Sequence, residues 1–178
     1  MGCNTALPYI CEAKMSYVEP SPDADDPRGT LQNCTGYHEH AFGEYCYRMH
    51  NYTVSWYDAE HRCVGDGGHV ITLHSGTENE VVKNWASSYI DPNEHGQWYV
   101  WLGLKRNKMF GFEWVDSSPL DYSHWAVGAP DTDSKSVLCG EMFSNGYWHD
   151  DDCTKKKTFG CKTQRMHEVS TSIYINRP

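Results

Sequence analysis

The sequence lacks the patterns that mark several common functional classes. Its 178 residues contain no stripe of lysine and arginine and no apolar run near the ~20 residues that a membrane-spanning helix needs. They also contain no Gly-x-Ser-x-Gly motif of a nucleophile elbow and no serine, histidine and aspartate in the order of a catalytic triad. No pair of acids is flanked by apolar residues in the way that acid–base catalysis favours. The net charge of −9 disfavours nucleic acid and anionic membrane surfaces as partners. We therefore expect no enzyme, no nucleic-acid binding and no membrane insertion of this segment.

Cysteine is abundant, with eight residues, but no Cys-x-x-Cys pair occurs. This pattern disfavours a structural zinc site and favours disulfides formed in an oxidising compartment. Asn33 and Asn51 begin Asn-x-Thr sequons and are the expected glycosylation sites. No signal-peptide h-region follows Met1, so we expect an excised piece of a longer protein that is secreted or exposed at the cell surface.

Composition divides the chain into four pieces. They are a cysteine-bearing segment (1–14), a proline-rich acidic linker (15–32), a globular body (33–163) and a tail or linker (164–178). Cys3 and Cys11 have seven residues between them and an aromatic residue two positions before the second, as do Cys153 and Cys161. We interpret residues 1–14 as the last strand of a preceding, similar domain. The pairing of Cys3 and Cys11 stays open.

The body reads as an α+β domain in which two helices precede several short strands. Ser55 and Ser75 are predicted N-caps, each followed three residues later by an acid. The predicted buried faces are Trp56, Ala59 and Cys63 in the first helix and Val81, Val82, Trp85 and Tyr89 in the second. Antiparallel strands are expected at 99–104, 111–115, 137–142, 146–148 and 158–162, with a long irregular segment at 116–136. Loops of that length inside compact domains are usually functional.

Several motifs occur in a distinctive order. They are Cys34 to Cys46-Tyr47, the helix 56–63 ending in Cys63, the turn 68–75, Trp101-Leu102-Gly103-Leu104, Trp114-Val115-Asp116, Trp125, Trp148-His149-Asp150 and Phe159-Gly160-Cys161. In these motifs the body resembles the long form of the C-type lectin-like domain family. The resemblance implies a disulfide-stapled fold with two helices flanking short antiparallel sheets. Together with the cysteine spacing of residues 1–14, it leads us to expect a chain excised from a tandem multi-domain extracellular protein. The resemblance also implies the pairs Cys34–Cys46, Cys63–Cys161 and Cys139–Cys153, which spacing alone cannot select.

In sugar-binding members of that family, a Ca²⁺ ion in the long loop bridges the protein to sugar hydroxyls through five key side chains. The corresponding positions here are Ala129, Asp131, Val137, His149 and Asp150, with a cis-proline expected at Pro130. Alanine and valine supply no side-chain oxygen, and imidazole is a poor ligand for a hard cation. Only Asp131 and Asp150 remain as metal ligands, so Ca²⁺ is a possible cofactor and no cofactor is certain.

Nearby acids could compensate for the missing ligands. They are Asp133, Glu141, Asp151 and Asp152, although Asp151 and Asp152 also read as a solvated acidic turn. The basic run 155–157 likewise reads as a solvated turn. Tyr122, Phe143 and Tyr147 are candidate ligand contacts.

We therefore expect a recognition module that binds a protein or glycan through its long loop without an intact calcium site. The expected ligand-binding residues are Pro130, Asp131, Asp133, Tyr147, His149 and Asp150. One alternative is a Ca²⁺-dependent lectin with rewired ligands, of the galactose type because Asp131 stands where mannose-preferring members have Asn. A second alternative is a structural spacer domain. Neighbouring lectin-like domains are possible partners in the parent chain.

Overall fold

A computed structural model describes residues 34, 40–92, 96–109, 111–131 and 138–165. The interpretations of residues 1–14, 15–32, Asn33 and most of the 164–178 tail lie outside this range and stay predictions. Asn51 lies within it, exposed on a strand, and its glycosylation also stays a prediction.

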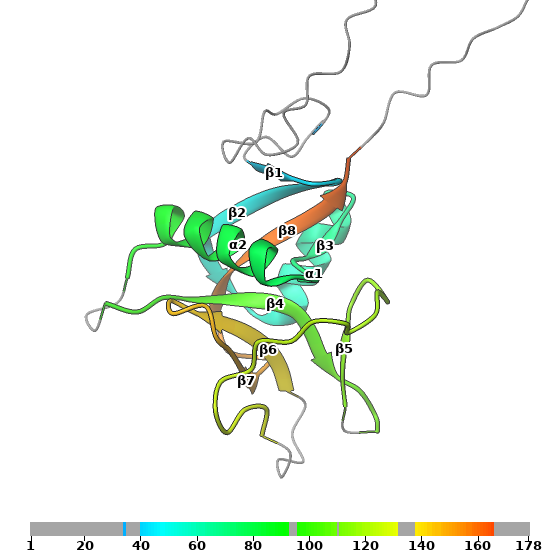
Figure 1. Cartoon of the computed structure of the whole chain (residues 1–178), viewed down its shortest axis with the longest axis vertical. Helices are drawn as coiled ribbons and strands as arrows, with labels where there is room; N and C mark the ends of the chain where they lie inside the picture. Colours follow the sequence, from blue (N-terminus) through cyan, green and yellow to red (C-terminus); the bar gives the residue numbers. More distant parts are fainter. Residues whose placement is uncertain (1–33, 35–39, 93–95, 110, 132–137, 166–178) are drawn as a thin grey trace, which may run out of the picture.

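The described residues form an eight-stranded sheet (Figure 1). Its strands are β1 (His40–Phe42), β2 (Tyr45–Val54), β3 (His69–Val70), β4 (Tyr99–Arg106), β5 (Phe112–Trp114), β6 (Leu138–Phe143), β7 (Trp148–Asp152) and β8 (Lys157–Gln164). The main path runs β1-β2-β8-β4-β6-β7, while β3 pairs with β8 and β5 pairs with β4. The last strand therefore lies in the middle of the sheet, beside the first hairpin.

The sheet is mixed, so the expectation of purely antiparallel sheets is wrong at one place. Strand β8 is antiparallel to β2 but parallel to β4, with Val100 opposite Thr158 and Trp101 opposite Phe159. Because β2 and β4 run in opposite directions on the two sides of β8, β8 can be antiparallel to only one of them. Sequence patterning does not report this long-range choice.

Both helices begin at the predicted caps. Helix α1 (Trp56–Gly65) starts after Ser55, whose hydroxyl accepts the backbone N–H of Asp58 at 3.2 Å. Helix α2 (Gly76–Tyr89) starts after Ser75, which accepts the N–H of Glu78 at 3.1 Å. Figure 1 shows α2 passing in front of the sheet and α1 behind it. Neither helix is long and apolar enough to cross a membrane within the described residues.

The buried face is predicted correctly for α1 but only in part for α2, where Val82 is buried and Trp85 packs against the core as expected. In α1 it is Trp56, Ala59 and Cys63. In α2 it is Glu78, Asn79, Val82 and Ala86, whereas Tyr89 is 39% exposed. The two polar residues turn inward because buried partners on other elements bind them, which a hydrophobic stripe cannot reveal.

The three implied disulfides are present: Cys34–Cys46, Cys63–Cys161 and Cys139–Cys153. All six cysteines belong to one cluster of the core, around Trp56 and Trp101. A second cluster holds Trp114, Trp148 and Leu102 with most of the remaining apolar residues. The α+β, disulfide-stapled fold is thus confirmed.

Gly103, in the Trp-Leu-Gly-Leu motif, is required by a close approach of two backbones. A Cβ atom there would lie 2.6 Å from the carbonyl oxygen of Val70. The Gly103 N–H also donates to the carbonyl of Ile71 at 2.7 Å, so β4 is held tightly against the segment that follows β3.

Candidate functional site

The long loop is attached to the start of β7 by backbone hydrogen bonds. Trp148 donates its N–H to the carbonyl of His124 at 2.8 Å, and Ala126 donates to the carbonyl of Trp148 at 2.9 Å. Trp125 and Trp148 form a parallel β-bridge between these bonds. The indole N–H of Trp148 donates to Asn79 Oδ1 of α2 at 2.8 Å. One buried tryptophan therefore fixes the loop to both the sheet and α2. The predicted strand at 146–148 begins only at Trp148 and runs to Asp152.

The two acids predicted as metal ligands are neighbours. The peptide between Ala129 and Pro130 is cis, as expected. The backbone N–H of Asp131 donates to Oδ1 of Asp150 at 2.9 Å. The other oxygen of Asp150, Oδ2, is buried and has no hydrogen-bond partner. The structure thus brings Asp131 and Asp150 together, with one oxygen of Asp150 already bound to the loop backbone.

His149 precedes Asp150 on β7. Its ring stacks on Phe143 of β6, with 3.9 Å between ring centroids and 24° between planes. Partial burial lowers the pKa of His149, against the opposing effect of the Asp150 carboxylate. An imidazole nitrogen is a poor ligand for a hard cation such as Ca²⁺, and this ring packs on a phenyl ring instead. Phe143 also contacts Tyr99 edge-on, at 4.7 Å between centroids.

Two of the acids that could compensate for the missing calcium ligands, Glu141 and Asp151, form ion pairs with lysines. Lys157 lies 2.7 Å from Glu141 and 2.8 Å from Asp151, while Lys155 lies 2.6 Å from Asp151. Asp152 accepts hydrogen bonds from the N–H and hydroxyl of Thr154, both at 2.8 Å.

The interpretation of Asp151 and Asp152 as a solvated turn is therefore wrong, because both belong to β7. The same interpretation of the run 155–157 is wrong for Lys157, whose side chain is only 11% exposed. Asp133 and Val137 lie outside the described residues.

The pKa values of Glu141 and Asp151 are shifted in opposite directions, although lysines lower both. Burial raises the pKa of Glu141, and the nearby Lys157 ammonium only partly offsets it. Burial alone would also raise the pKa of Asp151, but hydrogen bonds from Lys155 and Lys157 outweigh it and hold that pKa below its ordinary value.

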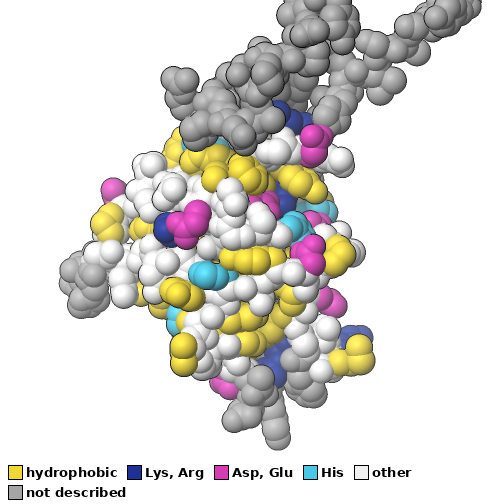
Figure 2. All heavy atoms as spheres, in the orientation of Figure 1, with side chains coloured by type: hydrophobic (Ala, Val, Ile, Leu, Met, Phe, Trp, Pro, Cys, Tyr) yellow, Lys and Arg dark blue, Asp and Glu magenta, His cyan; other side chains and the backbone are white. Residues whose placement is uncertain are grey.

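Aromatic rings line the loop side of the same surface. His124 stacks on Tyr147 with 4.5 Å between centroids and 11° between planes, and Tyr122 lies parallel to His124 at 6.1 Å. Tyr147 is 45% exposed. Figure 2 shows histidine and hydrophobic side chains close together on the face in front of the sheet. Of these rings, His124 is the one that sequence reasoning missed. Its two-residue spacing from Tyr122 in an extended segment is the signal that could have found it.

Comparison with known proteins identifies the family. The family described as "Lectin C-type domain" matches residues 52–163. The chain belongs to the C-type lectin family. Members of this family are binding modules rather than enzymes, in agreement with the sequence prediction.

Similar proteins include C-type lectins and a mannose receptor. A C-type lectin galactose-binding isoform of Pseudechis porphyriacus is 32% identical over 124 residues, covering 66% of this chain and 76% of that protein. C-type mannose receptor 2 of Rattus norvegicus is 26% identical over 163 residues, covering 90% of this chain but 10% of the receptor. The crystal structure of C-type lectin CEL-I from Cucumaria echinata is 26% identical with a TM-score of 0.63, covering 71% of this chain and 94% of CEL-I.

The lectin fold raises the question of whether its residues here fit a calcium ion. Ca²⁺ binds six to eight oxygens, several of them from carboxylates. Within the described part of the chain, no three His, Cys, Asp or Glu side chains gather in a metal-binding group. Among the described acids, two buried oxygens lack a hydrogen-bond partner: Oδ2 of Asp150 and Oε2 of Glu141, the second of which lies 2.7 Å from the Lys157 ammonium. The described donors therefore do not fit a complete family calcium site.

Proposed function

We propose that this chain is an extracellular recognition domain that binds a glycan or protein ligand through its long-loop face without calcium. This long-loop face comprises the segment 117–137 and the adjoining strands β6 and β7. The donor set of the loop is the observation that carries the proposal. Ala129 has no side-chain oxygen, His149 packs on Phe143, and Asp150 binds the backbone of Asp131.

The aromatic row offers a contact surface that needs no metal. The rings of Tyr122, His124 and Tyr147 lie parallel and cover one another's facing surfaces. Tyr147 is 45% exposed, and an exposed tyrosine combines apolar area with a polar hydroxyl. Such rings pack against the apolar face of a sugar or against a protein side chain. The backbone hydrogen bonds around Trp148 hold this surface in place, which lowers the entropic cost of binding.

Calorimetric titration of Ca²⁺ and a glycan array with and without EDTA test the proposal together. We expect no stoichiometric tight Ca²⁺ binding and array signals that chelation leaves unchanged. Tyr147→Ala should weaken those signals, while Tyr52→Ala, which removes an exposed tyrosine from β2, should not. One tight Ca²⁺ per chain, lost on Asp131→Ala or Asp150→Ala, would contradict the proposal. No saturable ligand at all would instead support a spacer domain.

A second candidate function is Ca²⁺-dependent binding of galactose. It is supported by the unpartnered buried Oδ2 of Asp150 and by similarity to lectins named as galactose-binding. This candidate predicts array signals that EDTA abolishes and free galactose inhibits. The effect of EDTA on the array signals therefore distinguishes the two functions.

We also propose that residues 1–14 derive from a neighbouring lectin-like domain in a tandem parent chain. The cysteine spacing of this segment supports the proposal, as does the receptor alignment, which extends beyond the matched lectin domain. Peptide mapping under non-reducing conditions should find Cys3 and Cys11 free, joined to each other or joined to another molecule. A bond from either one to Cys34, Cys63 or Cys139 would refute the proposal.

A further inference from the structure

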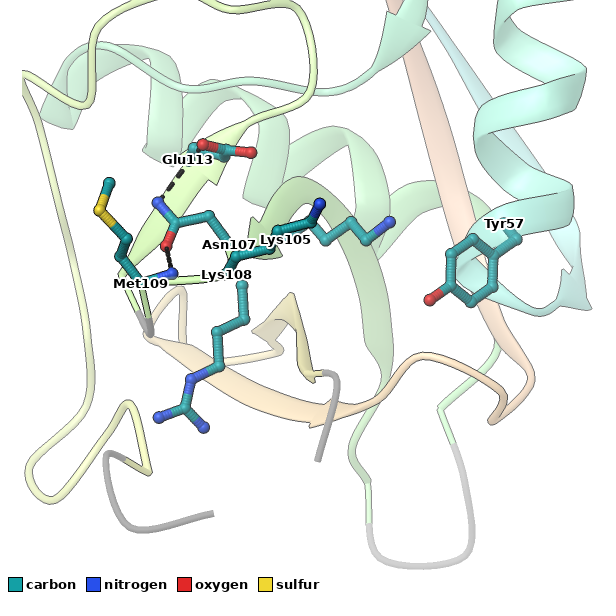
Figure 3. A pocket seen from close by; sticks show the side chains of 7 residues that line it. Tyr57, Lys105, Asn107, Lys108, Met109 and Glu113 are labelled. Carbon is teal, nitrogen blue, oxygen red and sulfur yellow. Dashed lines mark hydrogen bonds between the residues drawn. The ribbon is translucent and has the colours of Figure 1, made fainter. Parts of the chain in front are cut away.

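A pocket lies between α1 and the hairpin formed by β4 and β5, apart from the aromatic row. Its volume is about 580 Å³. Figure 3 shows its lining, which consists of Tyr57, Lys105, Arg106, Asn107, Lys108, Met109 and Glu113. This volume falls within the range of about 300–1,000 Å³ that is common for small-ligand sites. We call these seven residues the basic pocket.

The basic pocket carries a charge opposite to that of the whole chain. Three of its side chains are cationic and one is acidic, although the chain has a net charge of −9. Lys105 and Lys108 form no ion pair within the described residues. The acid, Glu113, accepts a hydrogen bond from Asn107 Nδ2 at 3.4 Å instead. Two ammonium groups therefore remain available to an anion.

Two aromatic rings hold Lys105 in position. Its ammonium lies 4.9 Å from the ring centroid of Tyr57 and 5.6 Å from that of Trp56. Figure 3 shows the Lys105 side chain extended toward Tyr57. Trp56 is itself fixed, because its indole N–H donates to the carbonyl of Leu102 at 2.7 Å. Cation–π contact orients the ammonium and leaves its N–H donors free for a ligand.

The hairpin tip that carries Lys108 is also fixed by hydrogen bonds. Oδ1 of Asn107 accepts the N–H groups of Met109 and Gly111, at 3.0 and 3.1 Å. The N–H of Asn107 donates to the carbonyl of Gly111 at 2.7 Å. Figure 3 shows Asn107 between Met109 and Glu113, joined to both by hydrogen bonds. A preformed tip reduces the ordering cost of binding.

We propose that the basic pocket is a second ligand site, which binds a short anionic saccharide carrying sulfate or carboxylate groups. Charge-assisted hydrogen bonds from the lysines would hold the anionic groups. The seven lining residues are far fewer than the roughly 20–30 that a protein interface uses on each side, so the size favours a small ligand. Charge screening over about 8 Å confines the attraction to the pocket, and the acidic remainder of the surface repels a long polyanion.

Calorimetry with a sulfated heparin-type disaccharide, and with the same disaccharide lacking sulfate, tests this site. We expect saturable binding of one sulfated molecule per chain, weaker at about 300 mM than at about 50 mM salt, and no binding of the unsulfated sugar. Lys105→Gln/Lys108→Gln should weaken binding at least about tenfold, because it removes two charge-assisted donors. Lys155→Gln/Lys156→Gln removes the same charge from another exposed turn and should leave the affinity unchanged.

Two further variants test binding at the basic pocket independently of binding at the long-loop face. Asp131→Asn/Asp150→Asn alters the long-loop face and should leave sulfated-sugar binding intact, so either proposal can fail alone. Lys108→Gln, which changes only an exposed side chain, repeats the test if the double variant has a lowered Tm.

Three results would overturn the inference. They are equal binding of the unsulfated sugar, an equal loss in the Lys155/Lys156 control, and tighter binding of a short acidic peptide.

Discussion

Replacing Lys162 with methionine should expose the cost of an unpaired charge in the core. The Lys162 ammonium lies 2.6 Å from Oε1 of Glu78 and donates to the carbonyl of Thr72 at 2.9 Å. Glu78 and Lys162 are only 4% and 5% exposed. Tyr47 donates its hydroxyl to Glu78 as well, and this carboxylate together with burial raises the pKa of Tyr47 well above its usual range.

The expected loss in the free energy of unfolding is about 3–5 kcal/mol, because methionine leaves the Glu78 carboxylate buried without its cation. Glu78→Gln in the same background should return about 2 kcal/mol, since it removes the charge and keeps an oxygen that can accept a hydrogen bond. Recovery should be partial, because Oε2 of Glu78 also accepts the N–H of His74 at 2.7 Å and an amide has one oxygen.

Urea unfolding of the oxidised protein, followed by tryptophan fluorescence, measures these changes, with equal m-values required for the comparison. Lys83→Met is the matched control. It breaks the ion pair between Lys83 and Glu80 on α2, in which Glu80 is 54% exposed, and should cost no more than about 0.5 kcal/mol. A loss below about 1 kcal/mol for Lys162→Met, or no recovery in the double variant, would refute the reasoning.

Three further predictions concern stability. Gly103→Ala should cost about 1–3 kcal/mol in urea unfolding, because its Cβ would meet a carbonyl oxygen at 2.6 Å, whereas Gly65→Ala, with no atom within 4 Å, should cost nothing. Burial alone would raise the pKa of Asp116, but hydrogen bonds from Ser118 and Thr72 hold it below the ordinary value. Its contribution should therefore be complete above pH ~4 and lost as pH falls through the folded-state pKa, and Asp116→Asn should flatten that acid limb of the stability curve. Replacing both cysteines of the Cys63–Cys161 pair with alanine should cost about 4.7 kcal/mol, against about 3 for the Cys139–Cys153 pair, because the closed loops span 98 and 14 residues.

Local features of the fold could be predicted because a few adjacent residues determine them. Each helix cap depends on a serine and the residue three positions later, and both are found where expected. The pairing of β8 could not be predicted in this way, because its partners β2 and β4 come from distant parts of the chain. The buried polar residues of α2 were missed for the same reason. Asn79 donates to Gly146 at 3.1 Å and accepts from Trp148, and both partners lie in later elements.

In the candidate site, too, features set by short motifs could be predicted, whereas features set by long-range contacts could not. The cis peptide at Pro130 and the neighbouring positions of Asp131 and Asp150 agree with expectations drawn from family motifs. The ion pairs of Asp151 with Lys155 and Lys157 depend on how the chain turns from β7 into β8, which neither the acidic run nor the basic run specifies by itself. The basic pocket combines a residue of α1 with residues of a later hairpin, so no sequence window contains it.

The long loop is attached to the rest of the domain by hydrogen bonds that involve no metal. In this chain, protein groups supply the bonds that hold the loop. The backbone of Trp148 binds His124 and Ala126, and Oδ1 of Asp150 binds the N–H of Asp131. The same carboxylate that the family uses as a metal ligand therefore also serves as a backbone acceptor. Because none of these bonds requires a cation, the loop can keep its conformation while Ala129 removes a calcium ligand. This arrangement supports the proposal of a calcium-independent recognition surface, and the chelation experiment tests it directly.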